Sequence, residues 1–493
     1  MRIKQRSGSM HYNDFVNCHT HDENSNVFGV KDSTNKLKNM ILYVANELKQ
    51  KGFVITNHEF IGNHVKAINT VKELKAKGKI PQDFKVILGN EIYLVDEQQL
   101  KTALEEKSRV RFYHFILMAK DEIGHQQLRE LSTRAYSHFF NYRGIDRRPT
   151  YYEDIEEVID ANPGHIIAST ACLGGFLGAK VMEEDYESAR NFIAWGQDVF
   201  GEDNFYLEMQ PHLKEYNEDG ILVTSEQELV NRWIYSENLP TIITTDAHYL
   251  RESDRELHKA YLKSDEDEET YASGGRETDS FYATTYFMSG QEIREKLNYY
   301  LPDDFISECF RNTVNIWERC EEYDLARPTV IPEIPLPPYV EWYHDEELIT
   351  FIKKNEFKNI LEVMYSENDQ DRYLITLALK GVRERGIPEE EWFETFERLD
   401  LEMFELIGIS KAKKATVSAY FVTLLAVLTI FWDEAECLLG CSRGSAAGWI
   451  TNYLLQIVHQ NPLKQPMAMP HWRFISATRP DYPKNIGVVV VNL

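Results

Sequence analysis

Short apolar runs alternate with amphipathic helical patterns through the first half of the chain. The helical patterns cover residues 34–51, 64–77 and 186–200, and the apolar runs cover 53–56, 86–88, 115–119, 166–169, 205–208 and 241–245. Alternation of this kind predicts βα units arranged around a parallel sheet or barrel. A length of about 250 residues suits a single βα barrel. The first half of the chain is therefore predicted to be an α/β domain.

The pattern changes after about residue 262. Residues 265–280 are acidic and then Gly-rich, which indicates a linker or loop, and a helical, polar pattern with a Pro-rich interruption follows to about residue 410. A second apolar core follows at 415–432 and 440–457. We therefore predict five parts, namely a flexible N-terminus (1–10), a first domain (11–262), a linker and helical connection (263–345), a second domain (346–483) and a tail (484–493).

Composition places the chain among ordinary globular proteins. Hydrophobic residues make up 43% and charged residues 27%. The most apolar run, 420–432, is shorter than the roughly 20 residues that cross a bilayer, and no early stretch has the form of a signal peptide. The 6 cysteines are scattered, which fits a reducing compartment better than a disulfide scaffold. We expect a cytoplasmic protein without a membrane partner.

The charge of the chain narrows its possible partners. A net charge of −25 argues against a generic nucleic-acid coat protein, because sequence-independent binding depends on Lys and Arg that neutralise phosphates. It leaves room for an enzyme with a local basic groove. The acidic runs at 265–269 and 389–391 are typical of solvated faces. The basic cluster Lys411, Lys413 and Lys414 stands out against this background.

A pair of histidines gives the first indication of chemistry. His19 and His21 are separated by one residue. In an extended segment, alternate side chains share a face, so both imidazoles would point to one place. Two surface histidines that are close by chance explain this pair equally well, so the pair alone leaves a metal site undecided.

Further ligand-type residues follow the predicted strands. His58 comes after 53–56, Glu91 after 86–88, and Asp246 and His248 directly after 241–245. In βα barrels, active sites are built at the carboxyl ends of the strands. The repeated placement favours a metal site over chance.

Three weaker candidates extend the set. His114 and Cys172 border two more predicted strands, and Asp32 lies in the loop after the histidine pair. Several imidazoles combined with carboxylates suit Zn, Mn or Fe better than Ca or Mg.

Six short segments resemble the motifs of PHP domains (polymerase and histidinol phosphatase). The match begins with His-Thr-His-Asp-Glu-Asn-Ser at 19–25, which resembles His-x-His-x-x-x-Ser, and continues with Thr-Asn-His at 56–58, Gly-Asn-Glu-Ile-Tyr at 89–93, Tyr-His at 113–114, Thr-Ala-Cys-Leu at 170–173 and Asp-Ala-His at 246–248. Asn57 stands where the family usually has Asp. The resemblance implies a distorted βα barrel with up to three Mn or Zn ions, held by His19, His21, Asp32, His58, Glu91, His114, Cys172, Asp246 and His248.

The resemblance also implies an activity. Metal sites of this kind hydrolyse phosphoesters, because two ions can clamp the attacking and the leaving oxygen. In polymerases with the full ligand set, the PHP domain can be a Mn- or Zn-dependent 3′–5′ exonuclease, and the catalytic residues expected here are His19, His21, His58, Asp246 and His248. Where the set is eroded, the domain serves only as a scaffold. His64 matches a pattern of phage relatives, but a lone histidine is more often structural, so we leave it out of the site.

A Gly-rich segment marks the second domain. Residues 440–448 read Gly-Cys-Ser-Arg-Gly-Ser-Ala-Ala-Gly. Small residues let a phosphate approach the backbone closely, and Arg443 could hold its oxygens, although a Gly-rich turn before a buried helix explains the pattern as well. The segment resembles the palm of C-family DNA polymerases, which implies an incomplete α+β palm in which Gly444 and Ser445 contact the incoming deoxynucleoside triphosphate. Cys441 and Ser442 depart from the family pattern.

The end of the sequence departs from the C-family pattern. In the family, an Asp-x-Asp pair that holds two Mg ions follows a proline equivalent to Pro483, but this chain continues Lys-Asn-Ile-Gly at 484–487 and then four valines. We expect either an interrupted gene, which we prefer because the match breaks abruptly, or a natural short product. Polymerisation would then need Mg-binding residues from sequence absent here.

Three hypotheses about function follow. The chain is a metal-dependent 3′–5′ exonuclease or phosphoesterase within a polymerase III alpha-like protein, or part of a DNA-directed DNA polymerase completed elsewhere, or a metal-stabilised scaffold that binds replication partners. DNA and replisome proteins are the partners that the resemblance implies. The full ligand set favours the enzyme over the scaffold.

Overall fold

A computed structural model describes residues 15–26, 31–142, 145–217, 219–264, 281–327, 333–336, 342–434, 444–467 and 469–478. The chain forms two compact units, Met1–Ala326 and Arg327–Leu493. The predicted flexible N-terminus (1–10), the predicted tail (484–493), the predicted loop at 265–280 and Arg443 lie outside the described residues.

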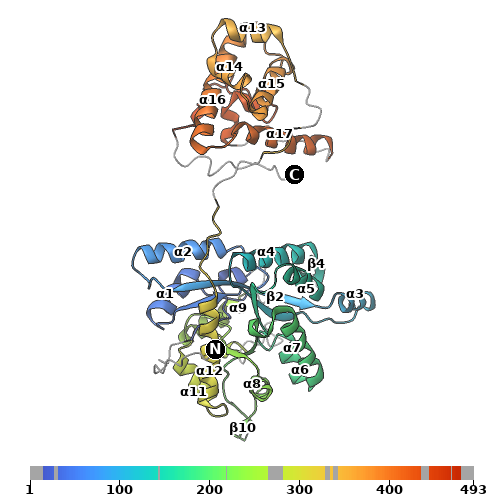
Figure 1. Cartoon of the computed structure of the whole chain (residues 1–493), viewed down its shortest axis with the longest axis vertical. Coiled ribbons are helices and arrows are strands. Elements are labelled where there is room, and N and C mark those ends of the chain that lie inside the picture. Colours follow the sequence, from blue (N-terminus) through green and yellow to red (C-terminus); the bar gives the residue numbers. More distant parts are fainter. Residues whose placement is uncertain are drawn as a thin grey trace, which may run out of the picture. The chain divides into compact units, whose positions relative to one another are not determined.

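A curled sheet forms the centre of the first unit (Figure 1). The order of its strands is β1 (Gly52–Ile55), β2 (Lys85–Val95), β3 (Tyr113–Ala119), β7 (Ile166–Ser169), β8 (Phe205–Met209) and β11 (Thr241–Ile243). A short strand, β6 (Thr150–Tyr151), pairs with β2. Two small antiparallel pairs lie apart from it, β4 (Phe140–Tyr142) with β5 (Ile145–Arg147) and β9 (Glu215–Tyr216) with β10 (Leu222–Val223).

The strand directions differ in part from the prediction of a parallel sheet. The pairs β1–β2, β7–β8 and β8–β11 are parallel, but β3 is antiparallel to both β2 and β7. Every residue of β7 and the last five of β3 are buried. A strand buried on both faces is a continuous apolar run whatever its direction, so the sequence pattern carried no information about the reversal of β3.

An extended segment near the N-terminus joins the two edges of the sheet. Asn17 forms a parallel bridge with Phe53 in β1, and Thr20 forms one with Ala247 beyond β11. The amide of Val54 donates to the carbonyl of Asn17 at 2.9 Å. The segment therefore closes the curled sheet, and the prediction of an α/β fold with a distorted barrel is confirmed.

Helices surround this sheet (Figure 1). They are α1 (Leu37–Asn46), α2 (His64–Ala76), α3 (Glu97–Glu106), α4 (Glu122–Ser137), α5 (Tyr152–Ala161), α6 (Phe176–Met182), α7 (Tyr186–Phe200), α8 (Glu226–Glu237), α9 (Arg255–Leu262), α11 (Gly290–Leu297) and α12 (Asp303–Arg319). Both α11 and α12, which fall in the predicted connection, pack into the first unit: Ile293, Ile306 and Phe310 are buried in its main core. Asn312 also donates to the carbonyl of Thr241 in β11 at 2.8 Å.

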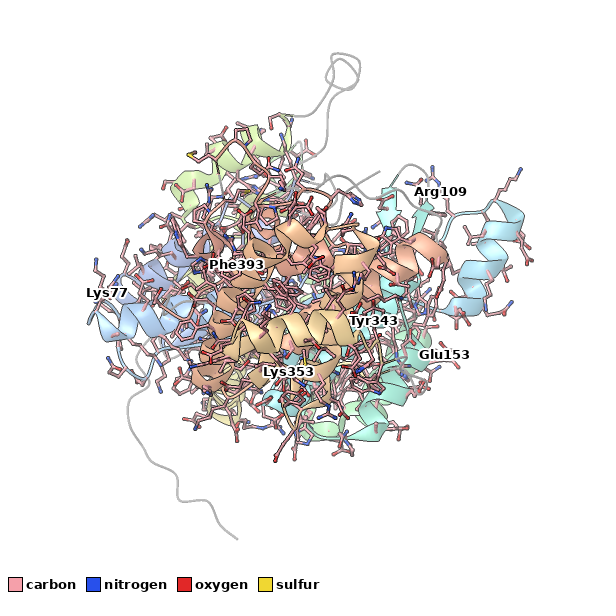
Figure 2. All side chains as sticks on the ribbon, turned by 90° about the horizontal axis from the view of Figure 1, so that it is seen from above. Lys77, Arg109, Glu153, Tyr343, Lys353 and Phe393 are labelled. Carbon is pink, nitrogen blue, oxygen red and sulfur yellow. The ribbon has the colours of Figure 1, made fainter. Side chains whose placement is uncertain are left out.

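The described residues of the second unit form only helical elements. These are α13 (Glu346–Lys354), α14 (Lys358–Met364), α15 (Asp369–Glu384), α16 (Trp392–Lys413), α17 (Ser418–Asp433) and the short α18 (Ile450–Leu454). Buried side chains of all six helices meet in one core. Phe393 of α16 is 52% exposed at the surface of this unit, where Figure 2 labels it with Lys353 of α13.

No described helix is by itself both long enough and apolar enough to cross a membrane. The segments Glu389–Lys413 and Ser418–Asp433 pass the same test only as a pair, and they are bent by 108° at their junction.

Candidate metal centre

Eight of the nine predicted ligands come together inside the first unit. Their ligand atoms form three groups, within each of which all atoms lie within 4.8 Å of one another. The groups are His21, Asp32, His58 and His248; His19, His21 and Asp246; and His58, Glu91 and His114. Since His21 and His58 each belong to two groups, the three form one continuous centre.

Glu91 lies at the junction of the groups. Its Oε2 is 3.2 Å from Nε2 of His19, 3.1 Å from Nε2 of His21 and 3.1 Å from Nδ1 of His58. Its Oε1 is 2.7 Å from Nδ1 of His114. Contrary to the prediction, Glu91 does not follow a strand, because β2 continues to Val95 and carries Glu91 in its middle.

Two aspartates complete the centre from opposite sides. Asp246 Oδ1 is 3.1 Å from Nε2 of His19 and 3.0 Å from Nε2 of His21. Asp32 Oδ2 is 3.1 Å from Nε2 of His248 and 3.5 Å from Nε2 of His58. The backbone of Asp246 has a φ of 46°, in the left-handed region that non-glycine residues rarely adopt. Such strain is common where a side chain must be held in a functional position.

Hydrogen bonds at the outer nitrogens fix how two of the imidazoles face the centre. Nδ1 of His21 contacts Ser25 Oγ at 2.8 Å, and that hydroxyl donates its own hydrogen to Asn57 Oδ1. Nδ1 of His248 contacts the carbonyl of Asp246 at 2.7 Å. In both cases the partner oxygen must accept, so Nδ1 carries a hydrogen and Nε2 is the nitrogen that faces the centre. Metal-binding histidines typically donate their outer N–H to a partner in this way.

Glu208 of β8 fixes the orientation of the His19 imidazole in the same way. Glu208 is not among the site residues predicted from the sequence. Its Oε1 lies 2.7 Å from Nδ1 of His19, and both side chains are fully buried. Hydroxyls of Ser169 and Thr244 each donate to Glu208 at 2.6 Å, and Gln210 donates at 3.2 Å. A carboxylate with these donors accepts from His19. The available signal was its position at the end of the predicted strand 205–208, which is where the other ligands were found.

Burial and charge oppose each other in the centre. Burial lowers the pKa of His21, but hydrogen bonds and charges from Asp246 and Glu91 outweigh it and raise the pKa to about 9. For His58 burial dominates, and its pKa falls to about 4 despite Glu91 and Asp32. Burial raises the pKa of Asp32, but His248 and His58 outweigh this and hold it well below the usual range.

Several polar atoms of the centre have no hydrogen-bond partner, although they are buried. Such atoms cost free energy unless a partner satisfies them. Among the described residues they include His21 Nε2, Asp32 Oδ2, His58 Nδ1, Glu91 Oε1 and Asp246 Oδ1. A divalent cation among these converging nitrogens and carboxylate oxygens would satisfy them. The residues therefore fit metal ions.

Cys172 lies at the border of the centre and outside the three groups. Its Sγ is 3.5 Å from Nδ1 of His114 and accepts a hydrogen bond from the amide of Gly174 at 3.3 Å. Burial, followed by the charges of Asp246 and Glu91, raises its pKa well above the usual value. Cys172 is thus a protonated thiol until a cation favours the thiolate.

His64 occupies a separate, structural place. Its Nε2 donates to the carbonyl of Gly89 at 3.1 Å, and its Nδ1 lies 3.0 Å from Nε2 of His125. Both imidazoles are buried, and burial lowers their pKa values to about 3 and about 4, respectively. His64 belongs to none of the three groups.

The predicted phosphate-contacting residues of the second unit are described only in part. Gly444 has a φ of 89°, a conformation that favours glycine, and Ser445 begins the 3-10 turn Ser445–Gly448. Glu402 of α16 is fully buried behind this turn and accepts hydrogen bonds from the amides of Ile450 and Thr451 at 2.6 and 2.9 Å. The start of α18, which follows the turn, is therefore anchored to α16.

Two family models match the chain. The PHP domain model matches residues 17–212, and the model of the bacterial DNA polymerase III alpha NTPase domain matches residues 372–485. The first match is to a PHP domain, and the second is to a segment of the polymerase III alpha subunit. All the predicted ligands except Asp246 and His248 lie within the residues that the PHP model matches, and the structure brings these two into the same centre.

Comparisons with individual proteins agree with the family models. A DNA-directed DNA polymerase of Bacillus phage SPbeta is 36% identical over 496 residues, which cover 95% of this chain and 36% of that protein. DNA polymerase III alpha subunits of Borreliella burgdorferi and Campylobacter jejuni are 27% and 26% identical, with 95% of this chain and 34% and 35% of theirs covered. The chain thus spans about a third of the length of these relatives.

Proposed function

We propose that the PHP domain of this chain is a metal-dependent phosphodiesterase that acts as a 3′–5′ exonuclease on DNA. The observation that carries the proposal is the convergence of eight imidazole and carboxylate side chains in three contiguous groups. A centre that served only to stabilise the fold would need one closed site, as structural zinc sites have. Three groups that share His21 and His58 instead suit neighbouring ions around one phosphate.

In the proposed site the ligands are His19, His21, Asp32, His58, Glu91, His114, Cys172, Asp246 and His248, with Mn or Zn as the ions. When bound, such ions act as Lewis acids that activate water and neutralise charge on the phosphate. Of these residues His19, His21, His58, Asp246 and His248 are proposed to be directly catalytic.

The protein's own groups support this chemistry before any ion binds. Glu208 and Ser25 hold His19 and His21 with their Nε2 atoms directed inward. Glu91 and Asp246 place negative charge between these imidazoles. A preorganised set of donors costs little reorganisation when the charge of a phosphate changes during reaction.

The test is removal of a 3′-terminal mispaired nucleotide from a primer–template by the whole chain with Mn or Zn. Asp246→Asn and His19→Ala are each expected to lower the rate by at least about 100-fold, because metal affinity and transition-state charge stabilisation are both lost. His64→Gln is the matched control, since His64 is buried in the same domain outside the three groups, and it should retain the wild-type rate at neutral pH. Equal rates in the wild type, Asp246→Asn and His19→Ala would refute the proposal. Bound ions without any hydrolysis would support a scaffold instead.

The second unit supports a further part of the same proposal. From the match to the polymerase III alpha model, Arg443, Gly444 and Ser445 of this chain are proposed to contact a deoxynucleoside triphosphate, and Mg ions would join the site when missing sequence completes it. DNA and other replisome proteins are then the partners, and the cytoplasm is the compartment. Photocrosslinking of an azido-deoxynucleoside triphosphate to the chain and to Gly444→Val tests this part. Equal labelling of both would contradict it.

A further inference from the structure

A short basic segment stands out in the acidic first unit. Residues 107–113 contain Lys107, Arg109 and Arg111 and no acidic residue, although the chain as a whole has a net charge of −25. All three basic side chains are exposed. Figure 2 shows Arg109 at the outer edge of the first unit, on the opposite side from Lys77.

Aromatic side chains pack along this segment. The amide of Val110 donates to the hydroxyl of Tyr142 in β4 at 3.1 Å, which donates in turn to the carbonyl of Ser108 at 3.3 Å. The ring of Phe112 lies 6.3 Å from that of Phe140 and 5.7 Å from that of Tyr142. The segment and the β4–β5 hairpin thus form one surface, which we call the basic–aromatic strip.

The inner end of the strip reaches the metal centre. The guanidinium of Arg147 lies 5.1 Å from the ring of Phe112 and 5.4 Å from that of Tyr93. Tyr93 stacks on the proposed ligand His58, with ring centroids 5.6 Å apart and an angle of 11°. It also lies 5.1 Å from His114. An unbroken series of side chains therefore leads from the surface to two proposed ligands.

A groove borders the basic segment, and Tyr113 is the aromatic residue that lines it. It has a volume of about 470 Å³ and lies between α3 and the basic segment, where Gln99, Arg109, Arg111 and Tyr113 are among its lining residues. Asp96 also lines it, but its carboxylate accepts from the amide of Gln99 and caps α3. The volume is in the range of ordinary small-ligand sites, about 300–1,000 Å³, and so is large enough for a nucleotide.

We propose that the basic–aromatic strip binds a single nucleic-acid strand and leads its end to the metal centre. The inference rests on the proposed function and names the surface by which that site takes its substrate. Arginines neutralise phosphates, and aromatic rings accept any base by stacking, which together are the features of sequence-independent single-strand binding. An acidic protein partner could also bind the arginines, but its binding would not require the aromatic rings. The combination of arginines and rings therefore favours a nucleic-acid strand.

The first experiment measures binding alone. Fluorescence anisotropy of a labelled single-stranded oligodeoxynucleotide is recorded with the whole chain in excess EDTA, so that no hydrolysis occurs. The double variant Arg109→Gln/Arg111→Gln is expected to bind at least about tenfold more weakly. The steepness of the plot of log binding constant against log salt concentration should decrease by about 1.4, which is about 0.7 for each lost phosphate contact. The control Lys77→Gln/Arg190→Gln removes the same charge from residues paired with Glu73 and Glu237 and should bind as the wild type does.

Equal affinity of the Arg109→Gln/Arg111→Gln variant and the wild type would overturn the proposal. Inorganic polyphosphate of the same charge as the oligonucleotide serves as competitor, and it is expected to compete poorly because it has no bases to stack. Equal competition by polyphosphate would also overturn it. The exonuclease proposal fails separately: a wild-type chain that binds the strand in EDTA but releases no nucleotide with Mn or Zn would refute the nuclease and leave the strip in place.

Discussion

Replacement of Glu208 tests whether this residue prepares His19 for a metal ion. Glu208→Gln retains the volume and one acceptor oxygen but removes the charge that faces Nδ1 of His19 at 2.7 Å. The hydroxyl of Ser169 donates to Glu208 at 2.6 Å and can turn to accept a hydrogen bond from the new amide. The substitution therefore leaves both the new amide and this hydroxyl with a hydrogen-bond partner. The variant should therefore fold, and its main effect should fall on His19.

The size of the effect follows from the role of such outer partners. Carboxylates that hold metal-binding histidines raise the basicity of the ligand, and their loss costs about 10- to 100-fold in metal affinity, or about 1.4 to 2.7 kcal/mol. Competition with a chromophoric chelator measures the affinity for Zn in the wild type and the variant. We expect the tightest of the sites that include His19 to weaken by that factor.

A second buried carboxylate of the same unit provides the control. Glu228 of α8 accepts from Arg232 at 2.6 Å and from Tyr299, and no histidine of the centre contacts it. Glu228→Gln should lower thermal stability without any change in Zn affinity. Zn affinity that is the same in Glu208→Gln as in the wild type would refute the assignment of Glu208 as a positioning residue.

Three further predictions concern stability. Burial lowers the pKa of His64 to about 3 and that of His125 to about 4, so the stability that depends on their neutral forms is present above pH 6.5 and is lost as the pH falls toward 4. Urea unfolding at pH 7 and pH 5 measures this loss, and in His64→Gln the loss at pH 5 should be smaller by about 2 kcal/mol. A loss equal to that of the wild type would contradict the assignment. Glu402→Ala leaves the amides of Ile450 and Thr451 without their acceptor and should lower the free energy of unfolding of the second unit by about 3–5 kcal/mol, whereas an unchanged denaturation midpoint would argue against that anchor. Chelation should lower the melting temperature of the first unit, and added Mn or Zn should restore it. At a metal concentration of about 100 times the dissociation constant, the free energy of unfolding should rise by about 2.7 kcal/mol. A melting temperature that changes with neither treatment would count against metal binding.

Periodicity explains which elements could be predicted from the sequence. The strand at 166–169 and the helix at 186–200 match Ile166–Ser169 and Tyr186–Phe200, because one is a closed apolar run and the other repeats its apolar positions at helical spacing. The pair His19 and His21 was recognised for the same reason, since alternation in an extended segment puts both on one face. These features depend on the spacing of residues that are close together in the chain, and that spacing can be read from the sequence alone.

Features that depend on distant partners could not be read in this way. The reversed direction of β3 is set by its pairing with β2 and β7, and its buried residues look the same in either direction. The middle of β2 brings Glu91 to the centre only because that strand is 11 residues long, beyond the apolar run that predicted it. The position of Glu208 at the end of a predicted strand was a signal, but its contact with His19 appears only when β8 takes its place in the sheet.

The most direct test of the metal centre is the metal content of the whole chain, after equilibration with Mn or Zn and removal of free ions, measured by inductively coupled plasma mass spectrometry. The structure predicts about two to three ions per chain, one for each group of ligand atoms, with the number reduced in a His21→Ala variant because His21 serves two groups. A wild-type chain that retains less than about one ion, or a His21→Ala variant with the same content as the wild type, would contradict the account.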